Sequence, residues 1–185
     1  MTTSSFDQLY RANPDPWAFA SSPYERARYA TILASLSRPR YHCALEAACS
    51  IGELTALLAP SCERLIAFDI SATAVARARQ RCAHLPQVQL QVADVRMLDL
   101  SARFDLLVFS EVGYYFDRPT LQRIILRLLA HLDTRGEFVA SHWLGHGAEH
   151  TLHGDEVHSV LQDMMAAPCR HSARYDGFRI DTWTR

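Results

Sequence analysis

Residues 44–59 read ALEAACSIGELTALLA, an apolar run that passes through a turn of small residues into a helical pattern. The apolar run is typical of a buried strand, and Gly52 gives the turn one residue that tolerates a left-handed backbone. Where the first strand of an open α/β sheet turns into its first helix, backbone N–H groups and the helix N-terminus can approach a ligand. The stretch therefore predicts a strand, a ligand-binding turn and a helix. A buried strand running into an ordinary helix is the alternative.

The same alternation of strand and helix patterns continues along the chain. The strand patterns are RLIAFDI, VQLQVADV, FDLLVFSEV and GEFVASHWL, and the helix patterns are PYERARYATILASL, SATAVARARQRCA, RPTLQRIILRLLAHL and DEVHSVLQDMMAA. Ser22 and Ser71 are the expected N-caps of two of these helices. The alternation predicts an α/β fold with a doubly wound, mostly parallel, Rossmann-like sheet that is covered by helices on both faces.

The two ends of the chain differ from this pattern. RHSARY and FRIDTWTR alternate with period two around Asp176 and Gly177, a pair typical of a hairpin turn, so we expect a seven-stranded sheet with a C-terminal antiparallel hairpin. A chain of 185 residues that is 49% hydrophobic can close one core. We expect a single domain, in which residues 1–38 form a polar N-terminal arm and a helix and residues 39–185 form the cofactor-binding core.

Composition excludes several classes of protein. The net charge is −1 and every basic residue is arginine, so a nucleic-acid partner is not expected, and neither a Schiff-base lysine nor a phosphate-binding P-loop lysine is available. Arg77, Arg79 and Arg81 are expected on a solvated helix face. Five cysteines without a CxxC pair indicate reduced thiols in a cytoplasmic protein. No apolar run approaches a membrane span, so no membrane association is expected.

Acidic residues stand where the strands are expected to end. Asp69 lies 17 residues after Gly52, where a carboxylate can accept both hydroxyls of a ribose in dinucleotide and S-adenosylmethionine sites alike. A nicotinamide site favours GxGxxG, which this turn lacks, so a pyrophosphate would meet side chains. An S-adenosylmethionine site begins with an acid in the pattern ExGxGxG and has a second acid after the third strand. Glu46 and Asp94 stand at these two places, which favours S-adenosylmethionine.

On these residues the chain resembles class I S-adenosylmethionine-dependent methyltransferases over nearly its whole length. More narrowly, it is similar to the bacterial nodulation protein S (NodS) family and to methyltransferase halves found beside sugar deacetylases. The stretches that carry the resemblance are LYRANPDPWAF with PYERARY, LEAACSIGELTALLAP, FDIS, FDLLVFSEVGYYF and HWLGHGAEHTLHGDEVH. The family pattern has glycine at position 48 and often at position 50, where this chain has Ala48 and Ser50. The methyl group of Ala48 is therefore expected to affect cofactor affinity rather than the fold.

The resemblance also implies site residues. It implies that the methionine part of the cofactor is lined by Glu46, Ala48, Cys49 and Gly52 and closed by Ser110 with Glu111, that Asp69 and Ile70 hold the ribose and adenine, and that Asp94 and Val95 flank the adenine. It further implies that the aromatic arm folds over the cofactor through Trp17, with Tyr24 and Arg28. The alternative is that Trp17 only anchors the arm on the core.

Methyl transfer requires alignment of donor and nucleophile, and an amine acceptor must lose a proton to react. The candidates lie at the ends of the fourth and fifth strands. His142 is the candidate base or acceptor-orienting group, with a backbone hydrogen bond as its alternative role. Glu111 serves the acceptor or the cofactor, and of Tyr114 and Tyr115 one is expected to face the cleft and the other to pack in the core.

Five histidines fall between residues 142 and 158, which raises the question of a metal site. Gly145, Gly147 and Gly154 indicate a loop, and HExxH is absent, so no metal is expected. We expect instead a flexible lid over the acceptor site.

The sequence thus predicts an enzyme that uses S-adenosylmethionine to methylate a small polar acceptor, and the resemblance implies an amino sugar or another sugar-derived amine. An NAD-dependent oxidoreductase and a noncatalytic binding module on the same fold stay open as alternatives. The acceptor and the oligomeric state are not specified.

Overall fold

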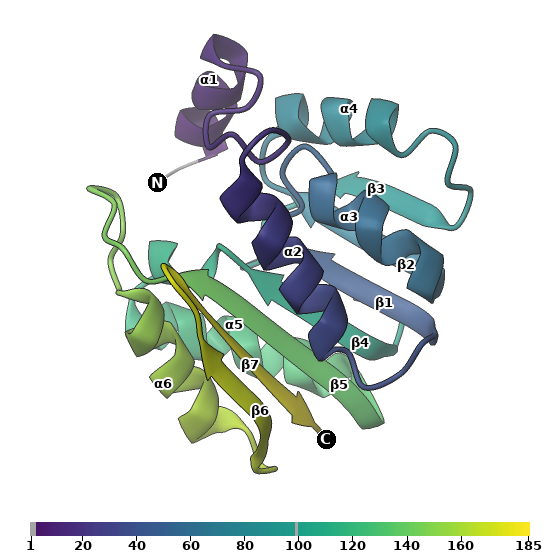
Figure 1. Cartoon of the computed structure of the whole chain (residues 1–185), viewed down its shortest axis with the longest axis vertical. Helices are drawn as coiled ribbons and strands as arrows, with labels where there is room; N and C mark the ends of the chain where they lie inside the picture. The colour runs from purple at the N-terminus through teal and green to yellow at the C-terminus, as the bar shows by residue number, and fades with distance from the viewer. Residues whose placement is uncertain (1–2, 99) are drawn as a thin grey trace.

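The computed structural model describes residues 3–98 and 100–185, and seven strands form one twisted sheet (Figure 1). The order across the sheet is β3-β2-β1-β4-β5-β7-β6; β1 to β5 pair in parallel, and β7 runs antiparallel to both of its neighbours. The strands are β1 (Tyr41–Ala47), β2 (Cys62–Asp69), β3 (Val88–Val92), β4 (Phe104–Ser110), β5 (Leu132–Trp143), β6 (Cys169–Arg174) and β7 (Phe178–Thr184). The predicted fold class, including the C-terminal hairpin, is confirmed.

Helices cover both faces of this sheet. They are α1 (Thr3–Ala12), α2 (Pro23–Ser35), α3 (Glu53–Leu58), α4 (Ala72–Arg81), α5 (Arg118–His131) and α6 (Gly154–Met164), with short 3-10 turns η1 (Ala59–Ser61) and η2 (Gly113–Tyr115). In Figure 1, α2, α3 and α4 lie on the near face, and α5 and α6 lie on the far face. The predicted caps are present, since Ser22 accepts from the Glu25 N–H and Ser71 from the Ala74 N–H.

Neighbouring residues of each central strand face opposite cores. Ala44 packs with the buried side chains of α2 and α3, whereas Leu45 packs with those of α5 and α6. Leu106 and Leu107 on β4 divide in the same way. A strand buried on both faces is apolar at every position, which explains why these segments read as continuous apolar runs. Each fully buried leucine contributes roughly 1.5–3 kcal/mol.

The N-terminal arm contains a helix that the sequence did not predict. Tyr10 of α1 is buried against Ile51 and Ala74, and Asp7 accepts hydrogen bonds from the Ser71 hydroxyl (2.7 Å) and the Thr73 N–H (2.9 Å). These two bonds lower the pKa of Asp7 to about 2. Contacts with α4 thus stabilise α1 beyond its own weak helical pattern.

Two of the arginines expected to be solvated make specific contacts with backbone carbonyls. Arg77 donates to the backbone carbonyls of Tyr10 (2.8 Å) and Pro14 (3.0 Å), and Arg81 donates to the carbonyl of Ile51 (3.0 Å). The prediction is therefore wrong for Arg77, which the arm partly covers by folding back onto α4, whereas Arg81 is exposed as predicted.

Among the described residues, no helix has the length and apolar character needed to cross a membrane. The division into residues 1–38 and 39–185 stays a prediction.

Candidate functional site

The turn after β1 takes a left-handed backbone at every second residue. The φ angles are 58° at Ala48, 51° at Ser50 and 82° at Gly52. A left-handed conformation costs an L-residue roughly 1–2 kcal/mol. Position 52 must also lack a side chain, because a Cβ on Gly52 would lie 2.9 Å from the Cβ of Ala78 on α4. The turn therefore keeps the geometry of a glycine-rich loop although only one of these three residues is glycine.

Asp69, at the end of β2, fixes this turn. Its two carboxylate oxygens accept hydrogen bonds from the Ser50 N–H and the Ser71 N–H, both at 2.9 Å. The side chain is only 6% exposed, and burial raises its pKa to about 6. Asp69 and its neighbour Ile70 both line the main cavity of the molecule.

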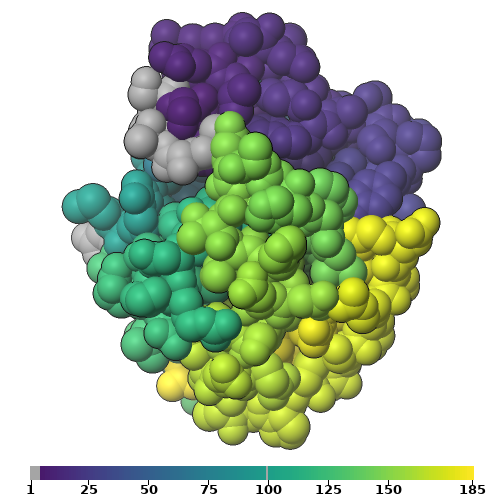
Figure 2. Space-filling view, turned by 90° about the vertical axis from the view of Figure 1, so that its left-hand side faces the viewer, coloured from purple at the N-terminus to yellow at the C-terminus, as the bar shows by residue number. Residues whose placement is uncertain are grey.

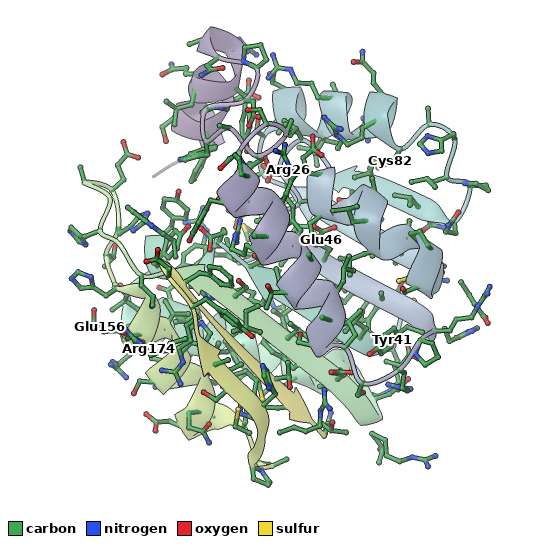
Figure 3. The ribbon with its side chains drawn as sticks, viewed as in Figure 1. Arg26, Tyr41, Glu46, Cys82, Glu156 and Arg174 are labelled. Atoms are coloured by element: carbon green, nitrogen blue, oxygen red, sulfur yellow. The ribbon has the colours of Figure 1, made fainter. Side chains whose placement is uncertain are left out.

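Glu46, on β1, lies in the interior between the sheet and the helices α2 and α3 (Figure 3). The residue is 2% exposed, and burial raises the pKa of its carboxyl to about 8. Its Oε2 atom has no hydrogen-bond partner within the described ranges. A small hollow beside Glu46 shares Ala48, Ser50 and Glu111 with the main cavity. A buried carboxyl group with an unpaired oxygen is thus available next to the turn.

The main cavity, of about 430 Å³, lies at the carboxyl ends of the parallel strands. Ala48 lines it without closing it, and Asp94 and Val95 line it after β3. From the N-terminal arm, the rings of Phe6, Tyr10, Trp17 and Phe19 also line the cavity. In the space-filling view, the loop after β5 (light green) rises toward the arm (purple) over this face (Figure 2).

Trp17 both lines this cavity and packs within the arm. Its ring stacks on Phe19 with centroids 5.6 Å apart and contacts Tyr10 at 5.5 Å, while Tyr10 is itself buried on the core. The two roles considered for Trp17 are therefore compatible. Figure 1 places the arm, with α1, at one end of the molecule beside α4.

Glu111 directly follows β4 and connects this strand to α2, β5 and η2. Its backbone φ is 56°, and its Oε1 accepts from the Trp143 N–H (2.7 Å) and from Arg28 Nη1 (2.9 Å). Its Oε2 accepts from the Tyr114 hydroxyl at 2.7 Å. Arg28, which is 1% exposed, also pairs with Glu25. A left-handed non-glycine residue held by this many contacts is typical of functional sites.

Tyr114 and Tyr115 both line the cavity, although Tyr114 is only 4% exposed and also belongs to the core. His150, from the loop after β5, stacks on Tyr114 with ring centroids 3.9 Å apart and also lines the cavity. In the sequence, His150 is only one of the five histidines between residues 142 and 158, and no specific role is predicted for it. No local signal distinguishes it, because a long loop connection brings it to the rings.

His142 is buried behind the cavity-lining rings of Tyr114 and His150 instead of facing the cavity. It is 0% exposed, its Nε2 accepts from the Gly113 N–H (3.2 Å), and its Nδ1 lies 3.2 Å from His158 Nε2. Burial lowers its pKa well below the ordinary value. We therefore correct its expected role as a base, since both ring nitrogens are engaged away from the cavity. The alternative role, a hydrogen bond with the backbone, matches this position.

Of the remaining expected site residues, Cys49 and Ser110 line the small hollow beside Glu46, and Asp94 lines the main cavity. Cys49 is buried, with a thiol pKa raised by burial, and Ser110 accepts from Arg28 Nη1 at 3.1 Å. Asp94 is held by Arg96, whose Nε lies 2.9 Å from one carboxylate oxygen. The described ranges contain no cluster of three side chains able to hold a metal ion.

Comparison with known proteins identifies relatives of this chain. A family model described as Nodulation protein S (NodS) matches residues 6–142. Nodulation protein S of Sinorhizobium fredii is 36% identical over 140 residues, which cover 74% of this chain and 65% of that protein. The protein of the same name from Rhizobium tropici is 36% identical over 124 residues, covering 64% of this chain and 52% of the relative. The chain thus spans between about half and two-thirds of the length of these curated relatives.

Solved structures are similar over more of their length. N-methyltransferase NodS from Bradyrhizobium japonicum WM9, in complex with S-adenosyl-L-homocysteine, superposes with a TM-score of 0.87 at 25% identity, covering 100% of this chain and 98% of that one. A candidate methyltransferase from Pseudomonas syringae superposes with a TM-score of 0.77 at 35% identity, covering 88% and 99% of the two chains.

Proposed function

Because the chain belongs to the nodulation protein S family, we propose that it transfers the methyl group of S-adenosylmethionine to the amine nitrogen of a small polar acceptor. The observation that carries this proposal is the cavity at the strand ends, with Asp69 at its floor and the left-handed turn at residues 48–52 beside it. N-methyltransferase NodS from Bradyrhizobium japonicum, whose fold this chain shares, binds S-adenosyl-L-homocysteine.

The charge of the cavity fits a cationic cofactor. Five carboxylates and one guanidinium, that of Arg96, line it among the described residues; the carboxylates are Glu25, Asp69, Asp94, Glu111 and Glu149. A negative, aromatic-lined cleft attracts sulfonium and ammonium groups. The unpaired Oε2 of Glu46 offers a further acceptor for a polar or cationic group. The residues present therefore fit S-adenosylmethionine.

In this proposal Asp69 and Ile70 hold the ribose and adenine, and Asp94 and Val95 flank the adenine. The turn with Ala48, together with Glu46, Cys49, Gly52 and Ser110, surrounds the methionine part. Trp17 covers the cofactor from the arm. Bound S-adenosylmethionine supplies an electrophilic methyl group, and the chain aligns the acceptor and excludes water, effects worth up to roughly 7–11 kcal/mol in well-oriented reactions.

Glu111, Tyr114 and Tyr115 form the acceptor side. Glu111 accepts three hydrogen bonds, one of them from a guanidinium, and these bonds hold both of its carboxylate oxygens in place. We therefore assign Glu111 to attraction and orientation of the amine rather than to proton removal.

We propose an amino sugar as the acceptor class. Trp143, at 37% exposure, lines the cavity, and in the loop that follows it the rings of His146 and His153 have centroids 4.5 Å apart. Exposed aromatic rings can contact a sugar's apolar face while their polar atoms hydrogen-bond its hydroxyls. The five free cysteines support a cytoplasmic location.

No observation favours the oxidoreductase alternative, because Ala48 and Ser50 place side chains where a pyrophosphate would need bare backbone. The open cavity beside Ala48 also gives no support to a module that has lost its ligand.

Isothermal calorimetry with S-adenosyl-L-homocysteine tests the cofactor assignment. We expect saturable binding by the wild-type protein and a loss of about tenfold or more for Asp69→Ala, since a charge-assisted hydrogen bond contributes about 1.5–3 kcal/mol. Asp163→Asn, on the exposed side of α6, is the matched control and should bind as the wild type does. Absence of binding at millimolar ligand would refute the proposal.

A further inference from the structure

We propose that His142 and His158 are positioning residues: a buried hydrogen-bond chain from Asp181 through both rings holds the η2 turn, and with it the acceptor side of the site. The inference rests on the proposed function for the meaning of that site. It gives a positioning role to three buried polar residues, His142, His158 and Asp181, that do not take part in methyl transfer itself.

The chain is continuous and fully buried. His158 Nδ1 lies 2.8 Å from Asp181 Oδ2, His158 Nε2 lies 3.2 Å from His142 Nδ1, and His142 Nε2 accepts from the Gly113 N–H at 3.2 Å. All three side chains are 0% exposed. They come from β5, α6 and β7, so the chain ties two strands and a helix to the turn that follows β4.

The backbone fixes the proton positions along this chain. The Gly113 N–H can only donate, so His142 Nε2 must be unprotonated, and a neutral ring then carries its hydrogen on Nδ1. That hydrogen is donated to His158 Nε2, which leaves His158 to donate from Nδ1 to Asp181. Every donor therefore points toward the carboxylate, which Arg179 pairs with at 2.8 Å.

Charged and titratable groups around His142 keep it neutral. Burial, followed by His158 and Arg28, lowers the pKa of His142 well below its ordinary value. His150 and Tyr114 also face the ring, from the loop after β5 and from η2. Burial would raise the pKa of Asp181, but the hydrogen bond from His158 and the contact with Arg179 lower it to about 2. The stable state thus has a neutral His142 ring at the Gly113 end of the chain and an ionised Asp181 carboxylate at the other end.

Gly113 fits closely against this chain. A Cβ at this position would lie 2.5 Å from Val157 Cγ1 and 3.0 Å from His142 Nε2, although the backbone of Gly113 is not left-handed. The glycine is therefore needed for approach, and η2 is seated directly on α6 and on His142.

The η2 turn contains Tyr114 and Tyr115, which belong to the acceptor side of the site. The Tyr114 hydroxyl donates to Glu111 at 2.7 Å, and its carbonyl accepts from the Thr151 N–H (2.8 Å) and the Leu152 N–H (3.1 Å) of the loop after β5. The His142 ring packs edge-on against Tyr114 at 5.6 Å. Displacement of Gly113 would move Tyr114, Glu111 and that loop together. Stability alone does not demand such a chain, because buried charged groups can often be replaced by apolar ones without loss.

The test compares His142→Leu, which removes the acceptor for Gly113, with His142→Gln, whose amide oxygen can accept at the same place. For His142→Leu we expect kcat to fall about 10- to 100-fold, the range for a misplaced reacting group, with the Kd for S-adenosyl-L-homocysteine within about threefold of wild type. His142→Gln should recover most of kcat. Ile180→Val, buried on the opposite core, controls for general destabilisation and should keep wild-type kcat.

Nitrogen-15 spectra of the wild-type imidazoles provide a test without any variant. They should show both His142 and His158 protonated on Nδ1 only at neutral pH. A proton on His142 Nε2, an unchanged kcat in His142→Leu, or equal loss of cofactor binding in both variants would overturn the inference. If the wild type transfers no methyl group at all, the proposed function fails, while the spectra still decide whether the chain exists.

Discussion

Ala48 and Ser50 show how far a backbone can hold residues in conformations that favour glycine. Both have φ near 55° and are kept there by surrounding bonds, such as the 2.9 Å bond from the Ser50 N–H to Asp69 and the contact between the Ser50 and Tyr10 hydroxyls at 2.5 Å. The ligand site can therefore form without the full set of glycines, and the missing ones affect stability rather than the path of the chain.

Replacing Ala48 by glycine should stabilise the protein. Relief of the left-handed alanine is worth roughly 1–2 kcal/mol, offset by roughly 0.5–1 kcal/mol of added backbone entropy in the unfolded chain, so we expect a net gain of up to about 1.5 kcal/mol. Urea unfolding measures it. Ala47→Gly, in the adjoining strand, is the control and should destabilise; equal losses in both variants would show that position 48 carries no strain.

Glu46 should make stability depend on pH. Its pKa rises from 4.5 to about 8 on folding, so the folded state binds the extra proton. This contribution is fully present below about pH 4.5 and is lost as the pH rises toward 8, at up to about 1.4 kcal/mol per pH unit. Glu46→Gln should flatten the fall in unfolding free energy over this window. Glu63→Gln, at the exposed end of β2, should leave the slope unchanged; a slope shared by all three proteins would contradict the buried protonated state.

At the scale of elements, the positions of the buried parallel strands can be predicted from the sequence, because strands covered on both faces must be apolar throughout. The acids Glu46, Asp69, Asp94 and Glu111 could be located in advance because parallel strands end at one edge of the sheet. Helix α1 could not, because a short helix gains most of its stability from packing, here against α4.

The burial of His142 could not be predicted from the sequence, for a related reason. Its position at the end of β5 is shared with cavity residues such as Trp143, and only the packing of α6, which brings His158 over it, decides which way it is used. The stack of His150 on Tyr114 depends in the same way on a loop whose path no periodicity specifies.

Arg77 should control the N-terminal arm. Its bonds to Tyr10 and Pro14 hold α1 against α4, and rings from this arm line the cavity. Arg77→Met should speed proteolysis within residues 1–22 and weaken S-adenosyl-L-homocysteine binding several-fold. Arg79→Met, which loses only a bond to Leu90 on the far side of α4, is the control. Unchanged cleavage and affinity in Arg77→Met would mean that the Asp7 hydrogen bonds and the aromatic rings hold the arm without Arg77.

At the scale of the whole molecule, two helix layers around one sheet leave a cavity at the carboxyl ends of the strands, and the charge gathered there is negative although the chain as a whole is near neutral. This arrangement suits a cationic cofactor and an amine. Cofactor binding should therefore raise the melting temperature, since ligand at 100 times its Kd stabilises the folded state by about 2.7 kcal/mol.

Mass spectrometry of a free-amine sugar such as glucosamine, incubated with the protein and S-adenosylmethionine carrying a deuterated methyl group, tests the central claim most directly. The account predicts one labelled methyl group on the sugar nitrogen, none when the sugar is N-acetylated, and less label when the protein carries Asp69→Ala. A labelled methyl group on a sugar oxygen, or a cofactor that binds while no free-amine sugar gains label, would contradict it.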